Sequence, residues 1–391
     1  MPTTLSRNLL YRAALPFLAP SPRGQMRHQA TGQPLNDPQG YERLLCRHHV
    51  LGASLLLSDD GLTARVDTSV REPQHHAEED TLYRVASITK MVTALAVLRL
   101  AGQGAFALDD AVAAFLPDGT AEPALEGITF RHLLTHTSGL CDISAADRAL
   151  AEGRTWHEVL REEGVRVGTP GGQFRYCNLA FGLLGCVIEQ VTGESVSQAV
   201  DRLAFSPLGM LATLDASGLD EHTVMPITRV LRYHPGHDMT ITPLGRIPLT
   251  ETDPTRHFGH TAGAMYTDAP SLSRLLSMIG SDGQGLVPPA LMREMRSEQA
   301  TYGKLSPGMA YGLGLVILRD PHLPGCRVLG HQGYAYGCAD GAFFDEKTGR
   351  QVIFLNGGCS EARSGRLGLC NRDVLRWALG KEIPSWHRSS L

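Results

Sequence analysis

A strongly apolar stretch lies within residues 81–100, TLYRVASITKMVTALAVLRL. Between residues 91 and 98 only Thr93 is polar, so a helix in this place has no solvent-facing stripe. A helix of that kind belongs in the interior of a protein. The pattern predicts a short strand-like segment, a turn, and then a buried helix that begins near Ser87.

Apolar runs near both ends of the chain predict β-strands. Two runs flank Asp59-Asp60-Gly61, and Asp-Gly between apolar runs is typical of a hairpin. In the last third, the segments YGLGLVIL, AYGCADGAFFD and RQVIFLNGG predict strands, with a turn at residues 346–349. A helix over residues 371–380 is expected to close the chain.

The middle of the chain is helical in pattern. Between residues 128 and 210, the segments FRHLLTHTSGL, TWHEVLREEG and NLAFGLLGCVIEQVTG predict helices. In the last of these, Gly182 and Gly185 permit close helix packing, and Gly193 is a natural C-terminal stop. Residues 214–258 are rich in loops, and further helices are predicted at residues 271–278 and 289–299.

Strands at both ends with helices between them predict an α+β fold. We expect a central antiparallel sheet, built from the N- and C-terminal parts and flanked by helices, with an inserted all-helical subdomain. The division that follows is an N-terminal arm at 1–40, a sheet subdomain at 41–110 and 259–391, and a mainly helical subdomain with loops at 111–258.

Composition narrows the function classes. Charged residues make up 19% of the 391 residues, the net charge is −4, and no long basic run occurs, so nucleic acid is not expected as a partner. No apolar run approaches the ~18 residues of a membrane span, so we expect a soluble protein without a membrane partner. The composition does not predict the oligomeric state.

The eight cysteines are scattered singly and form no C-x-x-C pair, which favours free thiols, a reducing compartment and a cytoplasmic location. The first 36 residues contain four arginines and no acid, a composition shared with transit peptides. Because Pro16, Pro20 and Pro22 interrupt any helix there, a flexible basic arm is favoured, and a targeting role stays open.

The predicted central helix carries candidate chemistry in its first turn. Ser87 and Lys90 are three residues apart and therefore share one helix face. Only four of the 36 basic residues are Lys, and a desolvated Lys, unlike Arg, can lose its proton near neutral pH. A neutral amine beside a hydroxyl makes Ser a nucleophile, although a chance Ser-x-x-Lys on a solvated helix is the competing interpretation.

Two further stretches hold candidate residues. In PGGQFRYCN, the Tyr176 hydroxyl at a helix start could shuttle a proton if it lies near Lys90, because a nearby cation favours the phenolate. In VLGHQGYAYG, small residues near His331 let a strand backbone approach a ligand, so that the N–H after Gly333 points at a developing oxyanion. Taken singly, the simpler interpretations are a Tyr packed on the core and a glycine-rich strand end.

The order of the three motifs is more specific than any one of them. Ser87-Ile88-Thr89-Lys90, Tyr176-Cys177-Asn178 and His331-Gln332-Gly333 together resemble the serine β-lactamase and penicillin-binding protein superfamily. The class C β-lactamase, D,D-carboxypeptidase and esterase branch is the most similar. Blocks that carry the resemblance extend over roughly residues 45–375: LYRVASITKMVTALAVLRLAGQGAFALDD, LLTHTSGL, NLAFGLLGCVIEQVTG, PLGM, TAGAMYTDAPSLSRLL and GHQG.

The resemblance implies a β-lactamase/transpeptidase-like fold and a role for each motif residue. Ser87 would be the acylated nucleophile, Lys90 its activating amine, and Tyr176 the second member of the acid/base network. Asn178 would hydrogen-bond the acyl-side amide of the substrate or Lys90. The backbone N–H groups of Ser87 and Tyr334 would form the oxyanion hole, and His331, Gln332 and Gly333 would contact the substrate.

The third motif departs from the Lys-Thr-Gly of many relatives, in which cation and hydroxyl grip a substrate carboxylate. Here His331 is charged only in part at neutral pH, and Gln332 replaces the hydroxyl, as in esterase, aminopeptidase and some carboxypeptidase members. A literal Lys347-Thr348-Gly349 lies between FFDE and RQVIF, where we interpret it as a hairpin turn that points away from the site.

Other chemistries find little support in the sequence. No G-x-S-x-G elbow, phosphate-binding glycine loop or H-E-x-x-H motif occurs. The pair His234 and His237 lies in a predicted loop without a matching carboxylate motif, so we predict no metal and no cofactor. His136 is interpreted as structural, a cation that suits a helix C-terminus.

The prediction is therefore a serine hydrolase that forms a Ser87 acyl-enzyme on an ester or amide of a small molecule or short peptide, with weak β-lactam hydrolysis as a possible side activity. The alternative is an acyltransferase that uses the same intermediate with an alcohol or amine as acceptor. A non-catalytic binding protein that has kept the pocket is the third hypothesis. Turnover of the acyl-enzyme in water alone distinguishes the first from the second.

Overall fold

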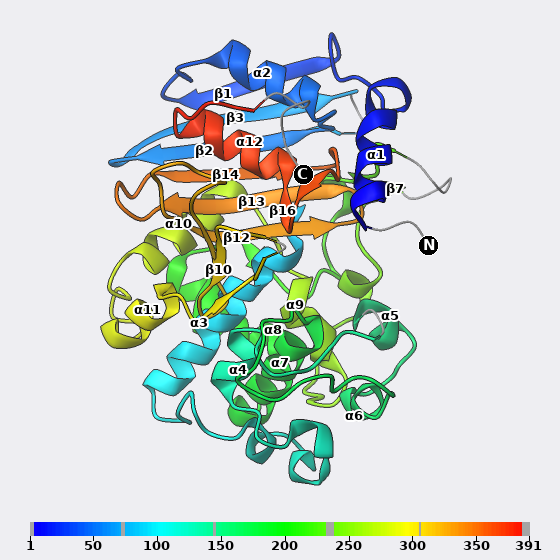
Figure 1. The fold of residues 1–391 in the computed structure, drawn as a ribbon, viewed down its shortest axis with the longest axis vertical. Coiled ribbons are helices and arrows are strands. Elements are labelled where there is room, and N and C mark those ends of the chain that lie inside the picture. The colour runs from blue at the N-terminus through cyan, green and yellow to red at the C-terminus, as the bar shows by residue number, and fades with distance from the viewer. Residues whose placement is uncertain (1–3, 72–74, 144–145, 232–237, 305, 385–391) are drawn as a thin grey trace.

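The strands from the two ends of the chain join in one antiparallel sheet. We describe a computed structural model that covers residues 4–71, 75–143, 146–231, 238–304 and 306–384. The sheet has nine strands in the order β1-β3-β2-β14-β13-β12-β11-β10-β9, and the pairing of β2 with β14 joins the N-terminal strands to the C-terminal ones (Figure 1). The strands are β1 Met26–Gly32, β2 Ala53–Asp59, β3 Leu62–Val70, β9 Ala300–Thr301, β10 Met309–Tyr311, β11 Val316–Leu318, β12 Val328–Ala335, β13 Cys338–Asp345 and β14 Gln351–Asn356.

Helices cover both faces of this sheet, which explains its long apolar strands. Leu55 and Phe354 point to the core beneath α2 and α12, whereas Leu56 and Ile353 point to the core that contains α3 and α10. Neighbouring residues of a strand face opposite sides, so a sheet buried on both sides needs apolar residues at consecutive positions. The helices are α1 Thr4–Leu18, α2 Pro38–Arg47, α3 Thr89–Gly102, α4 Phe130–Leu134, α5 Ala146–Ala151, α6 Trp156–Leu160, α7 Asn178–Thr192, α8 Val196–Val200, α9 His260–Gly263, α10 Ala269–Gly280, α11 Pro289–Arg296 and α12 Leu369–Ala378.

Short strands and single helical turns connect these elements. The loop-rich prediction for residues 214–258 agrees with the structure, because only two-residue strands and single turns occur in its described part. The short strands are β4 Tyr83–Arg84, β5 Ala212–Thr213, β6 Ile227–Thr228, β7 Asp238–Met239, β8 Tyr266–Thr267, β15 Arg363–Ser364 and β16 Leu367–Gly368. The turns that matter below are η1 Ala86–Ile88 and η9 His257–Gly259.

The inserted helices surround α3 and α7, in the half of the molecule below the sheet in Figure 1. The two predicted glycine contacts occur: a Cβ on Gly182 would lie 1.9 Å from the Phe258 carbonyl oxygen, and one on Gly185 would lie 2.4 Å from the Thr261 hydroxyl. These glycines let η9 and α9 pack directly on α7. Gly193 ends α7 with a φ of 69°, as predicted. The predicted α+β fold is confirmed; the subdomain boundaries stay a prediction.

The β2–β3 hairpin forms where Asp-Gly predicts it. Asp60 and Gly61 have φ values of 48° and 78°, the two left-handed positions of a tight hairpin turn. The segment YGLGLVIL, in contrast, is not one strand. It forms β10 and β11 with a turn between them, and Gly314 in that turn has a φ of 72° and lies against α3, where a Cβ would stand 2.5 Å from that of Ala94.

The expectation of a flexible basic arm is wrong for the described part of the N-terminus. Residues 4–18 form α1 with Pro16 inside it, although proline cannot donate a backbone hydrogen bond at this position. Leu15 is buried against Leu51 and Val70, which holds this helix on the molecule. Residues 26–32 form β1, which pairs with β3 at one edge of the sheet. A polar strand of this kind suits an exposed sheet edge. It contains too few apolar residues for the hydrophobic pattern to predict a strand there.

The structure bears on two expectations from composition, those for the cysteines and for membrane-spanning segments. All eight cysteines are free thiols. No single helix of the described residues is long and apolar enough to cross a membrane, and the segments Asn178–Thr192 and Val196–Leu208 meet that test only as a pair bent by 88°. The cytoplasmic location stays a prediction.

Candidate active site

Ser87 lies in η1, the single turn that precedes α3. It is half-buried, whereas its neighbours Ala86 and Ile88 are buried. Ala86 has a φ of 45°, a left-handed conformation that costs energy for any residue with a Cβ. The Val85 N–H donates to the Met265 carbonyl oxygen at 3.0 Å and fixes the turn from the other side. The nucleophile candidate thus sits on a strained, anchored turn, a feature that no sequence pattern indicated.

Lys90 lies in the first turn of α3 and is 0% exposed. Its Nζ lies 3.1 Å from Ser87 Oγ, 2.8 Å from Asn178 Oδ1 and 2.6 Å from the Ala262 carbonyl oxygen. The pKa of Lys90 is lowered to about 7, chiefly because burial penalises the ammonium. The structure therefore brings Ser87, Lys90 and Asn178 together, as the sequence predicts.

The partners of Lys90 determine where its lone pair points. The amide oxygen of Asn178 and the carbonyl oxygen of Ala262 can only accept hydrogen bonds. A neutral amine has two N–H groups, and both are directed at these two acceptors. The lone pair is then directed at Ser87 Oγ, where it can take the hydroxyl proton.

Tyr176 lies on the other side of the nucleophile. Its phenol hydrogen-bonds to the Ser87 side chain, and its ring lies 4.9 Å from Lys90 Nζ. Burial raises the pKa of Tyr176 above its usual value, despite the Ser87 hydrogen bond, so the phenol is protonated at neutral pH. The expected phenolate is therefore not the resting state, since desolvation outweighs any cation effect.

His136 supports Tyr176 rather than acting as a helix-capping cation. Its ring lies 4.3 Å from that of Tyr176, and its Nδ1 accepts a hydrogen bond from the Cys177 N–H at 3.2 Å. Burial holds the pKa of His136 well below its usual value, so the ring is neutral. The structural interpretation stands, but the charge that we expected at this position is wrong.

Asp142 is a site residue that the sequence analysis missed. Its carboxylate accepts hydrogen bonds from the backbone N–H groups of Asn178 at 2.8 Å and Leu179 at 3.0 Å, and so caps α7. It also accepts from Asn178 Nδ2 at 3.1 Å, which turns Oδ1 of that amide toward Lys90. The cap lies 36 residues before the helix that it serves, so no local capping pattern could have indicated it.

β12 carries the third motif, with its residues divided between two faces. His331 is 1% exposed; its Nδ1–H donates to the Gln332 carbonyl oxygen at 2.7 Å, and its Nε2 accepts from the Tyr311 hydroxyl at 3.0 Å. Burial lowers the pKa of His331 to about 3, so it is neutral. Both ring nitrogens are engaged by protein groups, and its role as a substrate contact stays a prediction.

The other members of this motif are placed by backbone geometry. A Cβ on Gly333 would lie 2.2 Å from the Val85 carbonyl oxygen, so only glycine lets β12 approach the turn that carries Ser87. The Gln332 side chain lies on the opposite face, where it binds the backbone of Arg366 and Gly368. The oxyanion hole of Ser87 and Tyr334 N–H groups stays a prediction that this close approach supports.

Two predictions remain, one for the Lys347-Thr348-Gly349 turn and one for a metal site. Lys347-Thr348-Gly349 lies in the exposed turn between β13 and β14, where the Thr348 hydroxyl donates to Asp345 at 2.7 Å, which agrees with the predicted turn. His234 and His237 lie outside the described residues. No three His, Cys, Asp or Glu side chains of the described segments gather as metal ligands, and the absence of a metal stays a prediction.

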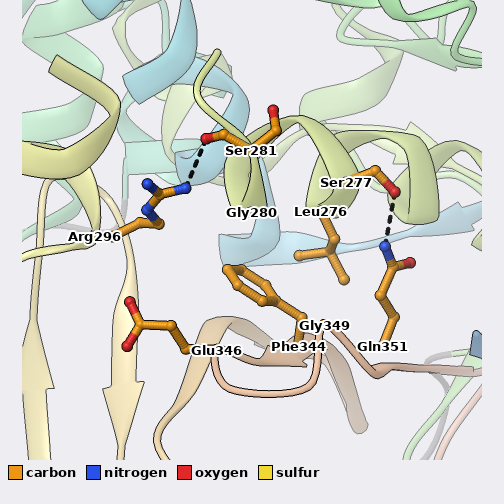
Figure 2. A pocket seen from close by; sticks show the side chains of 9 residues that line it. All are labelled: Leu276, Ser277, Gly280, Ser281, Arg296, Phe344, Glu346, Gly349 and Gln351. Carbon is orange, nitrogen blue, oxygen red and sulfur yellow. Dashed lines mark hydrogen bonds between the residues drawn. The ribbon is translucent and has the colours of Figure 1, made fainter. Parts of the chain in front are cut away.

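Two hollows are lined by residues other than Ser87. One of about 680 Å³ is bordered by Phe174 and Tyr302, whose ring centroids lie 4.3 Å apart with the planes tilted by 39°. Another of about 520 Å³ lies between α10 and the β13–β14 turn (Figure 2). Its polar side chains bind protein groups: Arg296 donates to the Ser281 carbonyl oxygen, and Gln351 donates to the Ser277 hydroxyl. Neither hollow is lined by residues 87–90, 176–178 or 331–333.

The chain is similar to several known proteins. The family model described as Beta-lactamase matches residues 27–358. Esterase EstB from Burkholderia gladioli is 32% identical over 341 residues, which cover 78% of this chain and 84% of that protein. The crystal structure of a D-stereospecific amidohydrolase from Streptomyces sp. is 25% identical, with a TM-score of 0.67, over 86% of this chain and 96% of the other. That of the D-amino acid amidase from Ochrobactrum anthropi SV3 is 22% identical, with a TM-score of 0.65, over 85% and 96%.

The chain therefore belongs to the beta-lactamase family, and the predicted family resemblance is confirmed. It is a serine hydrolase of that family, with esterases and amidases among its relatives. The D-amino acid amidase has been solved with D-phenylalanine and with L-phenylalanine amide, both small ligands.

Proposed function

We propose that this protein is an esterase that works through an acyl-enzyme on Ser87. The observation that carries the proposal is the environment of Lys90, whose two acceptor-only partners leave the lone pair of the neutral amine for the Ser87 hydroxyl. A pKa near 7 makes that neutral form available at physiological pH. The relationship to esterase EstB supports an ester as the substrate.

The acylation step follows from this arrangement. Ser87 Oγ attacks the ester carbonyl carbon while its proton moves to Lys90 Nζ. The carbonyl oxygen becomes an oxyanion, for which the backbone N–H groups of Ser87 and Tyr334 are the donors. The protonated phenol of Tyr176 gives its proton to the departing alkoxide, and the proton that Lys90 took from Ser87 then returns the phenol to its protonated form through the departing alcohol.

Deacylation reverses the roles of the same groups. Water enters beside the acyl-enzyme, loses a proton to the Tyr176–Lys90 pair, and attacks the acyl carbon. The tetrahedral intermediate then expels Ser87 Oγ, which is reprotonated by Lys90. Asn178 keeps the amine in place throughout, because its own amide is held by Asp142.

Intact-mass analysis with an ethoxy fluorophosphonate and with 4-nitrophenyl butyrate tests the proposal. We expect one fluorophosphonate adduct on wild-type protein, none on Ser87→Ala, and release of nitrophenol only by the wild type. A fluorophosphonate adduct on correctly folded Ser87→Ala protein would refute the nucleophile. A butyryl adduct that persists in water but disappears with an added alcohol would identify the alternative, an acyltransferase. A chromogenic cephalosporin in the same panel measures β-lactam hydrolysis.

A further inference from the structure

The N-terminal helix α1 exposes large apolar side chains. Among the described residues seven such side chains are exposed, and three of them belong to this one helix: Leu10 at 65%, Phe17 at 87% and Leu18 at 70%. Single exposed apolar residues are common on soluble proteins, whereas a group of them on one element marks a binding surface. The other four come from separate segments: Leu62, Ile143, Val167 and Leu211.

Helix geometry places these side chains on the outer side of α1. Leu10 and Phe17 are two helical turns apart and therefore lie on one side, with the exposed Ala13 between them. Leu15 lies on the other side, where it is buried in the cluster that contains Leu51. A helix that is apolar on both sides is normally covered on both. We call Leu10, Ala13, Phe17 and Leu18 the α1 outer face.

The rest of the protein holds this helix in place. The Tyr11 hydroxyl accepts a hydrogen bond from the Glu361 N–H at 2.9 Å. Just after the helix, His49 Nδ1 donates to the Pro20 carbonyl oxygen at 3.0 Å. Figure 1 shows α1 at the margin of the molecule, beside the ends of the sheet strands. The α1 outer face is therefore presented to solvent by a fixed element.

Positive charge borders the α1 outer face. The helix itself contains two arginines and no acid, and the first acid of the chain is Asp37. Arg23 and Arg27, in the segment that follows, are exposed. Met26, between them, packs against the same cluster as Leu15, so this basic segment returns to the body of the protein beside the helix.

An apolar face with a basic border suits a membrane surface better than a second copy of this chain. Two copies joined through this face would bring their basic segments together, and like charges oppose such pairing. A membrane with anionic lipids offers both an apolar interior and negative headgroups, and these two attractions together give stable peripheral binding. The expectation of no membrane partner rested on spanning length, which a helix lying on a surface does not need.

We propose that the α1 outer face docks this protein on a membrane surface that contains anionic lipids. The helix would lie in the plane of the interface, with Leu10 and Phe17 among the upper parts of the acyl chains and Arg23 at the headgroups. This contact uses no residue of the Ser87 site, so it does not depend on the proposed esterase function.

Flotation of the full chain with lipid vesicles tests the proposal. The bound fraction would be measured on phosphatidylcholine vesicles with and without phosphatidylglycerol, at about 0.1 M and about 0.5 M NaCl. We expect at least about fivefold more bound protein on the anionic vesicles at low salt, and a smaller difference at high salt. Binding to neither kind of vesicle, or equal binding to both, would overturn the proposal.

Substitutions on α1 test which face binds. The double variant Leu10→Ser and Phe17→Ser should lower the partition coefficient by at least about tenfold, because both apolar side chains are removed from the lipid. Arg23→Gln should lower it by about fivefold at low salt. The matched control changes two exposed leucines elsewhere, Leu62→Ser and Leu211→Ser, and should bind as the wild type does.

Two results would overturn the role of α1, with circular dichroism to verify folding. One is undiminished vesicle binding by both the double variant and Arg23→Gln. The other is a wild-type dimer in light scattering that the double variant converts to a monomer, with no vesicle binding by either. That second result would show that another copy of the chain covers the α1 outer face.

Discussion

The polar side chains in the two halves of the active site have different hydrogen-bond partners. In the half formed by α3 and α7, the buried groups are directed at the nucleophile: Lys90 contacts Ser87, and Asp142 holds Asn178 against Lys90. In the half formed by β12, the side chains bind other protein groups instead: the His331 ring bonds to Tyr311, and Gln332 binds backbone on the opposite face of the strand. In the proposed mechanism the first half transfers protons through its side chains, whereas the second contributes a backbone that approaches the Ser87 turn closely.

This difference indicates which substitutions the site tolerates. A side chain that moves a proton cannot be replaced without loss of the chemistry, so we expect little tolerance to substitution in the first half. A strand that contributes backbone constrains only the size of its residues at the point of approach, so its other positions can change. Lys-Thr-Gly can become His331-Gln332-Gly333 as long as the glycine is retained.

Removing the amine of Lys90 should give the largest loss. Lys90→Met fills a similar volume without a base, and we expect kcat/KM to fall roughly 10⁴-fold. Lys90→Arg should fall comparably, because Arg does not lose its proton near neutral pH. Steady-state kinetics on a 4-nitrophenyl ester, with circular dichroism to verify folding, provide the measurement. An active Lys90→Arg variant would contradict the assignment of Lys90 as the base.

Adding a methyl group to Gly333 tests whether the close approach of the β12 backbone to the Ser87 turn matters. Gly333→Ala places a Cβ against the Val85 carbonyl oxygen, so β12 must move away from η1 and carry the Tyr334 N–H with it. Loss of one oxyanion donor costs roughly 10²–10³-fold in kcat. Gly218→Ala is the control, since nothing lies within 4 Å of a Cβ there. Wild-type kcat in Gly333→Ala would show that this approach does not matter for catalysis.

Asp142→Asn should change the pH profile as well as the rate. In the wild type, kcat/KM should rise through an apparent pKa of about 7 as Lys90 loses its proton. The Asp142 carboxylate raises the pKa of Lys90 against the effect of burial, so removing that charge moves the acid limb to lower pH. We expect a rate loss of about tenfold at pH 8.

A pH–rate profile of Asp142→Asn beside Asp220→Asn, a surface N-cap variant, checks this expectation. If the acid limb stays near 7 while the rate falls, Asp142 serves only to cap α7. A change in thermal stability common to both variants would be attributed to the lost caps, each worth about 1 kcal/mol.

Tyr311→Phe should have the smallest effect on catalysis. The change removes the hydroxyl that donates to His331 Nε2 and leaves a buried acceptor without a partner. We expect the free energy of unfolding to fall by about 1–3 kcal/mol, with kcat/KM within severalfold of the wild type. Denaturant unfolding and ester kinetics provide the two measurements. A loss of activity as large as that of Lys90→Met would place His331 among the groups that act on the substrate.

The sequence alone predicted the elements whose signals are local. The apolar residues of α3, the Asp60-Gly61 turn and the glycines of α7 each act through neighbours in the chain or through a requirement for minimal size. The order of the three motifs then indicated the family. The contact of Ser87 with Lys90 was also predictable, because residues three positions apart in one helical turn lie on the same face.

Only the tertiary structure decided the contacts between distant segments. The cap from Asp142 to α7, the neutral state of His331, the strained Ala86 and the contact of Gln332 with the Arg366 backbone all depend on burial or on partners elsewhere in the chain. The polar strand β1 also forms only because β3 offers it an edge. Hydrophobic periodicity predicts which residues are buried, but it does not predict which buried polar atoms form hydrogen bonds with one another. The geometry of this site depends on such hydrogen bonds.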